Sequence, residues 1–195
     1  MGINEIKKEL LKYYTRSYED GLMAGTSGNA SILTADRMMI ITPSGVDYRE
    51  LTEAHLVVTT LDGEVIDVSY APSSEWRLHA AIYRNIEGAK AVLHTHSSYA
   101  TAFAVVGKPI PEILIEMTLF LNGKVPVCGF APAGTQQLAD MAADTLKTSP
   151  ACLMQNHGVA AYGDDIKTAY LRATYVEDAA RIYSHARMLG EPILL

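Results

Sequence analysis

Two hairpin patterns in the first third of the chain constrain its fold most. Residues 30–33 show strand-like alternation, and an apolar segment follows at residues 38–42 after a short turn. Residues 56–61 and 64–68 then flank Asp62-Gly63, a dipeptide that is the strongest short-range signal for a tight hairpin turn. Strands joined by hairpins pair antiparallel, so these patterns predict a largely antiparallel sheet.

Helices are expected before, between and after these strands. Residues 3–20 carry apolar side chains at helical spacing, and Gly21 can end that helix. A second helix is expected from Pro72-Ser73-Ser74-Glu75, with serine caps and an acid in its first turn. Later helices are predicted at residues 97–106, 134–147 and 166–189, and short β segments at residues 89–94, 152–155 and 159–162.

This order of elements predicts the fold class. Hairpins combined with helices on all sides favour a three-layer α/β/α fold, in which a central, mostly antiparallel sheet is flanked by helices. A chain of 195 residues is long enough for one sizeable core and short for two, so residues 1–195 are expected to form a single domain.

Charge and composition exclude several classes of partner. The net charge is -6, and no run of Lys or Arg is present to replace the counterions of nucleic acid or anionic lipid. The N-terminal segment carries charges throughout, and no apolar run is long enough to span a bilayer. We therefore expect a cytoplasmic protein that binds neither nucleic acid nor membranes. Cys128 and Cys152 are too few for a disulfide framework and are expected to be buried thiols.

The histidine pattern indicates a metal site. His94 and His96 close a β segment, and a spacing of two along a strand sends both imidazoles to the same side. His157 lies between two further β segments, on a tight turn beside the flexible Gly158. Three histidines and one displaceable carboxylate would form an open zinc site suited to catalysis. The pattern alone leaves open that these are structural histidines, because an isolated H-x-H pair arises easily by chance.

Three short segments have the composition of an anion site. Thr26-Ser27-Gly28-Asn29, Thr42-Pro43-Ser44-Gly45 and Pro72-Ser73-Ser74 combine glycine with small hydroxyl or amide side chains. Backbone N–H groups and hydroxyls of this kind can bind a phosphate, and the third segment also lies at an expected helix N-terminus. Each segment alone is more typical of an ordinary turn or cap, so the argument depends on their occurring together.

Five motifs carry a family resemblance. In chain order they are GTSGNAS, ITPSG, PSSEWRLHAAIY, VLHTHSSYATA and QNHGVAAYG. Together they resemble the class II aldolase and adducin family, most of all its fuculose-phosphate aldolase branch, and they span nearly the whole chain. The resemblance implies one zinc ion per chain, replaceable by Mn²⁺ or Co²⁺. It also implies a homotetramer with active sites at subunit interfaces.

The resemblance also assigns roles to individual residues. It implies that the metal ligands are Glu75, His94, His96 and His157. It implies that the phosphate contacts are Gly28, Asn29, Ser44, Gly45, Ser73 and Ser74. His79, four residues beyond Glu75 on the same expected helix, can support the ligands from behind.

The implied reaction is the reversible cleavage of a ketose 1-phosphate into dihydroxyacetone phosphate and an aldehyde. L-fuculose 1-phosphate and related deoxy or pentulose phosphates are the expected substrates. Glu75 would move a proton as general base and acid. Ile115 stands where the fuculose-phosphate branch uses a tyrosine from the neighbouring subunit, so the adjacent Glu116 is the expected second acid/base, unless it is an ordinary surface carboxylate.

Other functions within the same family remain open at this stage. A sugar-phosphate 4-epimerase, a dehydratase or a decarboxylase would use the same histidines. Glu75 favours aldol cleavage, because the epimerase branch usually carries aspartate there and the dehydratase branch generally lacks a metal-binding carboxylate. A binding module similar to adducin is the alternative without enzymatic activity, but it has no need of an open metal site.

Overall fold

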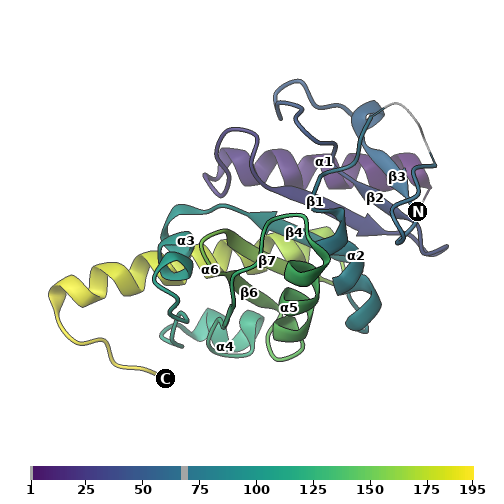
Figure 1. Cartoon of the computed structure of the whole chain (residues 1–195). Coiled ribbons are helices and arrows are strands. Elements are labelled where there is room, and N and C mark those ends of the chain that lie inside the picture. The colour runs from purple at the N-terminus through teal and green to yellow at the C-terminus, as the bar shows by residue number, and fades with distance from the viewer. Residues whose placement is uncertain (1, 67–69) are drawn as a thin grey trace.

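The protein contains one seven-stranded sheet with strand order β3-β2-β1-β4-β7-β6-β5 (Figure 1). The computed structural model describes residues 2–66 and 70–195. All neighbouring strands pair antiparallel except β5 and β6, which are parallel. The strands are β1 (Asn29–Leu33), β2 (Met39–Ile41), β3 (Val57–Thr59), β4 (Ala91–Thr95), β5 (Val127–Cys128), β6 (Ala151–Met154) and β7 (Gly158–Gly163). The prediction of a mostly antiparallel sheet is confirmed.

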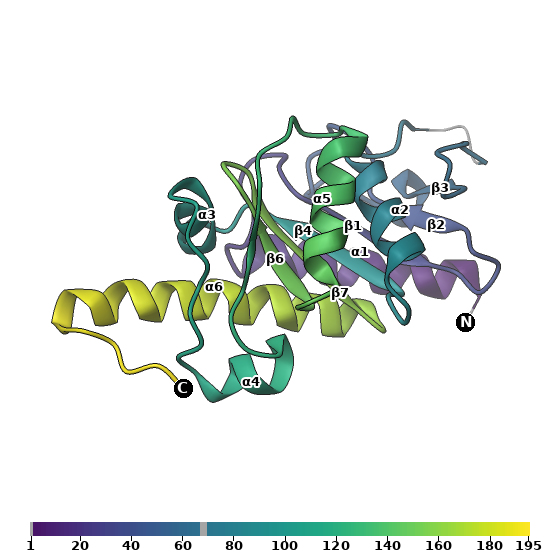
Figure 2. The same ribbon diagram turned by 60° about the horizontal axis from the view of Figure 1, so that its bottom comes forward.

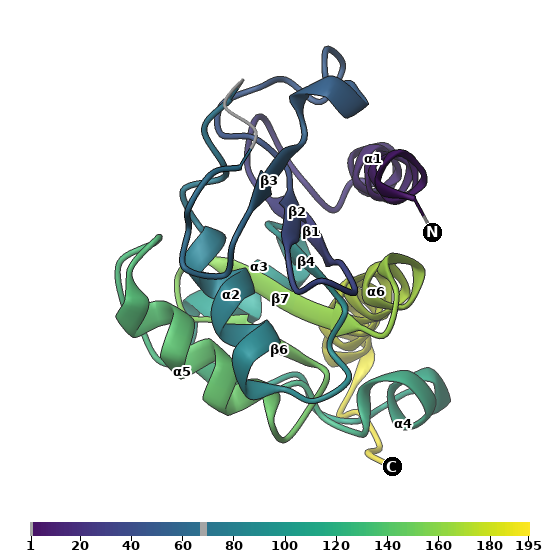
Figure 3. The ribbon, with the colours of Figure 1, turned by 90° about the vertical axis from the view of Figure 1, so that its right-hand side faces the viewer.

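Helices cover both faces of this sheet. They are α1 (Ile3–Glu19), the short 3-10 helix η1 (Glu53–His55), α2 (Trp76–Asn85), α3 (Ser98–Val105), α4 (Ile115–Leu121), α5 (Gln136–Leu146) and α6 (Ile166–Leu189). Figure 3 shows α2 and α5 on one side of the sheet and α1 and α6 on the other. Figure 2 shows α4 beside α6, whose C-terminal part extends beyond the sheet. The three-layer α/β/α prediction is therefore confirmed.

Strand residues alternate between two cores, one on each face of the sheet. Ile40 and Leu93 pack with α1 and α6, whereas Met39, Ile41 and Val92 pack with α2 and α5. All five are fully buried. Successive strand side chains point to opposite faces, so burying both faces requires apolar residues in succession, and the central strands have them.

The first predicted hairpin forms, with Ser31 paired with Ile41. The second forms only near its turn, where an isolated bridge joins Thr59 to Val65. Residues 67–68, at the end of its expected second strand, lie outside the described part of the chain. Gly63 in this turn has a φ of +85°, and a β-carbon there would lie 2.5 Å from the ring of Trp76. Only glycine fits this position.

The helix predicted from Pro72 begins later, at Trp76, and has no acid in its first turn. The preceding residues are extended because they pair with the segment after β2. Pro72 forms a bridge with Pro43, and the Ser73 amide donates to the carbonyl of Thr42. Glu75 is therefore the N-cap residue of α2 and lies at the helix end rather than within its first turn.

Three short elements were missed, η1, α4 and β5, and apart from α2 and the second hairpin the predicted boundaries hold closely. α4 spans seven residues and β5 two, too few to show a period. Cys128 and Cys152 are buried and free, as expected. Within residues 2–66 and 70–195, no helix is long and apolar enough to cross a membrane.

Candidate metal and substrate site

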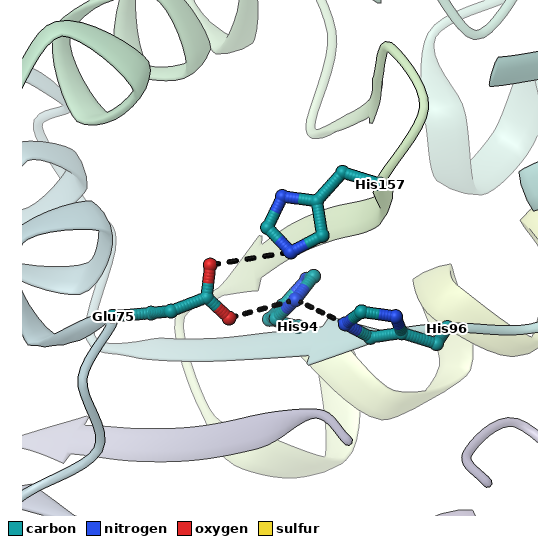
Figure 4. A group of neighbouring side chains, drawn as sticks. All are labelled: Glu75, His94, His96 and His157. Carbon is teal, nitrogen blue, oxygen red and sulfur yellow. Dashed lines mark hydrogen bonds and ion pairs between the residues drawn. The ribbon is translucent and has the colours of Figure 1, made fainter. Parts of the chain in front are cut away.

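The four predicted metal ligands lie together at the end of the sheet where β4 ends and β1 and β7 begin (Figure 4). The candidate ligand atoms of Glu75, His94, His96 and His157 are all within 4.8 Å of one another. His94 Nε2 lies 3.0 Å from Glu75 Oε2 and 2.9 Å from His96 Nε2. His157 Nε2 lies 3.3 Å from Glu75 Oε1. Four segments far apart in sequence thus converge on one point.

The two histidines of the H-x-H pair reach the site from different backbone environments. His94 is a residue of β4, whereas His96 lies just beyond the end of that strand. The amide of His96 donates to the carbonyl of Leu22 at 3.2 Å, which ties this residue to the loop after α1. The predicted same-side orientation of the two rings is confirmed, although a strand does not hold both.

His157 is held by a tight turn between β6 and β7. Its amide donates to the carbonyl of Met154 at 3.0 Å, and the preceding Asn156 has a φ of +56°. A β-carbon on Gly158 would lie 2.3 Å from the carbonyl oxygen of Thr95 and 3.2 Å from His94 Cε1. Gly158 is thus required for close packing between strands, not for the flexibility that its position suggested.

The orientation of these groups fits a bound cation. His94 Nδ1 lies 2.8 Å from the carbonyl oxygen of Val159 and must donate to it, so in the neutral ring the Nε2 atom carries a lone pair. That lone pair faces the carboxylate of Glu75 and the ring nitrogen of His96. Among the described residues, Glu75 Oε1 is buried without a hydrogen-bond partner. Asn29 donates to Glu75 Oε2, but Oε1 and the lone pair of His94 Nε2 converge without a donor of their own, an arrangement that a bound cation would stabilise.

The pKa shifts within this cluster also favour a bound cation. Burial opposes ionisation of Glu75, but the charge and hydrogen bond of His94 outweigh it and lower the Glu75 pKa. Burial also disfavours protonation of His94, yet the neighbouring Glu75 raises its pKa. Burial and the charge of His94 lower the pKa of His96 to about 3. A neutral His96 ring and an ionised carboxylate are the forms that bind metals.

A cleft of about 250 Å³ adjoins this cluster. All three predicted phosphate segments line it, and every predicted phosphate contact is included: Gly28, Asn29, Ser44, Gly45, Ser73 and Ser74. Glu75, His96 and His157 line it as well. The co-occurrence on which the sequence argument depended is therefore confirmed in space.

Close backbone contacts hold these segments in place. The Ser73 amide donates to the carbonyl of Thr42 at 3.0 Å, which joins the second and third segments. Gly28 has a φ of +85°, and a β-carbon there would lie 2.9 Å from the carbonyl oxygen of His94. Gly134 similarly approaches the carbonyl oxygen of Ser74. Ala133, beside it in the loop between β5 and α5, lines the cleft and was missed, although the surrounding Pro and Gly mark a loop.

Glu116 is not part of this cluster within one chain. It lies half-buried in the first turn of α4, a helix that packs against α6, and is not among the residues that line the cleft. Within one chain, Glu116 therefore does not line the cleft, and its predicted catalytic role stays a prediction.

Comparison with known proteins assigns the family. The model described as Class II Aldolase and Adducin N-terminal domain matches residues 8–184. The chain belongs to the class II aldolase and adducin family. This confirms the resemblance that the five motifs indicated.

Relatives named as aldolases are similar over almost the whole chain. The 5-deoxy-D-ribulose 1-phosphate aldolase of Bacillus thuringiensis serovar kurstaki is 36% identical over 196 residues, covering 100% of this chain and 92% of its own. The L-fuculose phosphate aldolase of Escherichia coli O6:H1 is 33% identical over 193 residues, covering 99% and 89%. A solved structure of L-fuculose 1-phosphate aldolase superposes with a TM-score of 0.93 at 35% identity, covering 98% of this chain and 90% of that one. These relatives are lyases, the enzyme class predicted for this chain.

Proposed function

We propose that this chain is a zinc-dependent aldolase that reversibly cleaves a ketose 1-phosphate into dihydroxyacetone phosphate and an aldehyde. One observation carries the proposal: a three-histidine, one-carboxylate cluster and a polar cleft lined by glycine and serine form a single site. The names of the relatives support L-fuculose 1-phosphate and 5-deoxyribulose 1-phosphate as the first substrates to test.

The phosphate would be bound by neutral donors. Within the described ranges, no Lys or Arg lines the cleft, so backbone N–H groups and the hydroxyls of Ser44, Ser73 and Ser74 are the available partners. Ser73 and Ser74 also precede the N-terminus of α2, where unpaired amides and the helix dipole favour an anion. With the phosphate at these segments, the neighbouring carbonyl carbon of the substrate would face the histidine cluster.

Glu75, His94, His96 and His157 would hold the zinc ion. When bound, zinc supplies Lewis-acid stabilisation of the negative charge that develops on the carbonyl oxygen. Glu75, displaced from the metal by substrate, would act on carbon: after the bond between C3 and C4 breaks, its carboxyl group would deliver a proton to C3, and in the reverse direction it would remove that proton. Burial of Glu75, which is 6% exposed, keeps water away from this transfer.

The second acid/base would come from a neighbouring subunit in a homotetramer. Glu116 is the proposed group, which would exchange a proton with the C4 hydroxyl that becomes the aldehyde oxygen. Exposed apolar residues on α4 support such an interface: Ile115 is 60% exposed and Leu119 is 68% exposed. Apolar side chains gathered on one short helix are typical of a surface that is covered in an assembly.

The alternatives differ in what they require of the site. A 4-epimerase, a dehydratase or a decarboxylase could use the same cluster, but a carboxylate at position 75 favours aldol cleavage. A binding module similar to adducin has no use for three converging histidines, so the intact cluster argues against it.

The test combines metal content with product release. Purified protein is analysed for zinc, then assayed for dihydroxyacetone phosphate release from L-fuculose 1-phosphate, 5-deoxyribulose 1-phosphate and ribulose 1-phosphate. We expect about one zinc per chain and release that is abolished in Glu75→Gln. Bound zinc without release from any of these substrates would instead favour the epimerase, dehydratase or decarboxylase. Absence of zinc would favour the binding module.

A further inference from the structure

A line of buried hydrogen bonds runs behind the metal cluster and ends on its carboxylate. Tyr83 Oη lies 2.6 Å from Ser31 Oγ, which lies 2.7 Å from His79 Nδ1. His79 Nε2 lies 2.5 Å from Asn29 Oδ1, and Asn29 Nδ2 donates to Glu75 Oε2 at 3.1 Å. All five side chains are buried. The proposed aldolase mechanism does not by itself use Tyr83, Ser31 or His79.

Two secondary-structure periods bring these residues together. Glu75, His79 and Tyr83 recur every four residues along α2 and share one face of the helix. Asn29 and Ser31 are alternate residues of β1 and point to the same face of the sheet, the one that α2 covers, because both bond to His79 of that helix. Alternate residues of β1 therefore face every fourth residue along α2, and their polar side chains form hydrogen bonds with one another.

Each hydrogen bond in this line is donated toward Glu75. An ionised Glu75 only accepts, so the Asn29 amide must present its NH₂ group to the carboxylate and its Oδ1 to His79. His79 then must carry its hydrogen on Nε2, which leaves Nδ1 to accept from the hydroxyl of Ser31. The oxygen of Ser31 in turn accepts from Tyr83. Burial lowers the pKa of His79 to about 3, which agrees with a neutral ring.

This arrangement makes the two oxygens of Glu75 unequal. Oε2 accepts from Asn29 and faces His94 at 3.0 Å. Oε1 has no hydrogen-bond partner among the described residues and lies 3.3 Å from His157 Nε2 (Figure 4). Oε2 is therefore held by the Asn29 amide, whereas Oε1 faces the ligand cluster without a donor.

We propose that His79 is a positioning residue for the reaction at Glu75. Its Nε2–H tautomer, selected by Ser31, orients the Asn29 amide to donate to Oε2, which fixes the orientation of the Glu75 carboxylate. The proposal rests on the proposed aldolase function, because that function defines the reaction at Glu75. The competing explanation is that His79 only fills space between α2 and the sheet.

A conservative pair of variants separates these explanations. In His79→Gln, the side-chain amide can still donate to Asn29 and accept from Ser31, whereas in His79→Leu it can do neither. We expect kcat of the zinc-loaded His79→Leu enzyme to fall about 10–100-fold, as for other groups that orient metal-site residues. KM should change little, and His79→Gln should recover most of the loss. Equal losses in both folded variants, or no loss in either, would overturn the proposal.

A matched serine pair tests the far end of the line. Ser31→Ala removes the hydroxyl that selects the tautomer, and Ser17→Ala removes an equally buried hydroxyl that bonds only within α1. We expect Ser31→Ala to lower kcat, with Ser17→Ala at the wild-type value. Identical kcat values for the two variants would count against a role for Ser31.

A measurement on the wild-type protein tests the same hydrogen bonds without activity and without any variant that could fail to fold. Nitrogen-15 NMR of wild-type protein labelled at histidine reports which ring nitrogen of His79 carries hydrogen, with or without zinc. We expect the Nε2–H tautomer; the Nδ1–H tautomer would refute the line of donors. If the protein cleaved no ketose phosphate, the aldolase proposal would fail. The NMR measurement would still show whether His79 has the tautomer that the line of hydrogen bonds requires.

Discussion

Gly158 lies directly against the backbone of Thr95: a β-carbon on Gly158 would be 2.3 Å from the carbonyl oxygen of Thr95. The two residues belong to β7 and β4, which pair through Thr95 and Val159. Because His94 precedes Thr95 and His157 precedes Gly158, this contact sets the distance between two of the proposed ligands. The spacing of the cluster is therefore set by how closely two strands approach.

Replacing Gly158 with alanine is expected to disturb the metal site and the sheet together. The new methyl group overlaps backbone that cannot move away without shifting β4 or β7, a strain of about 1–3 kcal/mol. Zinc content and the thermal unfolding temperature should both fall. Gly190→Ala is the control, because no atom lies within 4 Å of a β-carbon at Gly190. A Gly158→Ala protein with normal zinc content would contradict the argument.

Glu177 is expected to stabilise the segment that follows His96. Its carboxylate on α6 accepts from the amides of Tyr99 and Ala100 at 3.0 and 2.8 Å, in place of an N-cap side chain for α3. Glu177→Ala leaves those amides unpaired and should cost about 1–2 kcal/mol of stability. Chemical denaturation measures the loss.

A neighbouring residue provides the control for Glu177. Asp178→Ala removes only an exposed ion pair with Arg181 and should have little effect on stability. Equal destabilisation by Asp178→Ala and Glu177→Ala would show that the cap contributes nothing specific.

Glu116 should be required for turnover but not for metal binding. It lies outside the ligand cluster, so Glu116→Gln is expected to keep normal zinc content and stability and to lose at least about 100-fold in kcat. Glu9 of α1, which is half-buried as Glu116 is, provides the control Glu9→Gln, which should behave as wild type.

Hybrid tetramers test whether Glu116 acts across a subunit interface. Glu75→Gln and Glu116→Gln subunits are each inactive in this scheme, but a mixed ring pairs an intact Glu75 with an intact Glu116 at some interfaces. Random mixing of equal amounts should restore activity to roughly a quarter of the wild-type value. Mixtures as inactive as their parents would argue that both groups act within one chain.

Acid should destabilise the wild-type protein partly through His79. Its folded pKa of about 3 lies below the ordinary value of 6.5, because burial disfavours the charged ring. The unfolded state therefore binds a proton that the folded state does not, and stability is lost as pH falls from about 6.5 toward about 3, at about 1.4 kcal/mol per pH unit. The measurement is urea unfolding at several pH values. The slope in this window should be smaller for His79→Gln, and parallel curves for the two proteins would refute the prediction.

Much of the fold could be predicted because it depends on local patterns. Apolar spacing marked α6 at residues 166–189, and the structure has it as Ile166–Leu189. α4 could not be found this way, because seven residues are too few to show a helical period. The start of α2 was placed too early, because Pro72 and Ser73 pair with the segment after β2, a contact that local sequence does not report.

The candidate site, like the fold, could be predicted only in part from the sequence. By itself, the sequence determined the types of group present: the H-x-H pair, the glutamate, the three segments of glycine and small polar residues, and through five motifs the family. The tertiary structure alone decided that Asn29 lies opposite His94, that Ala133 closes the cleft, and that His79 reaches Asn29 rather than solvent. Residue type and spacing are local properties of the chain, whereas these contacts join residues 50 or more positions apart and exist only once strand register and helix packing are set.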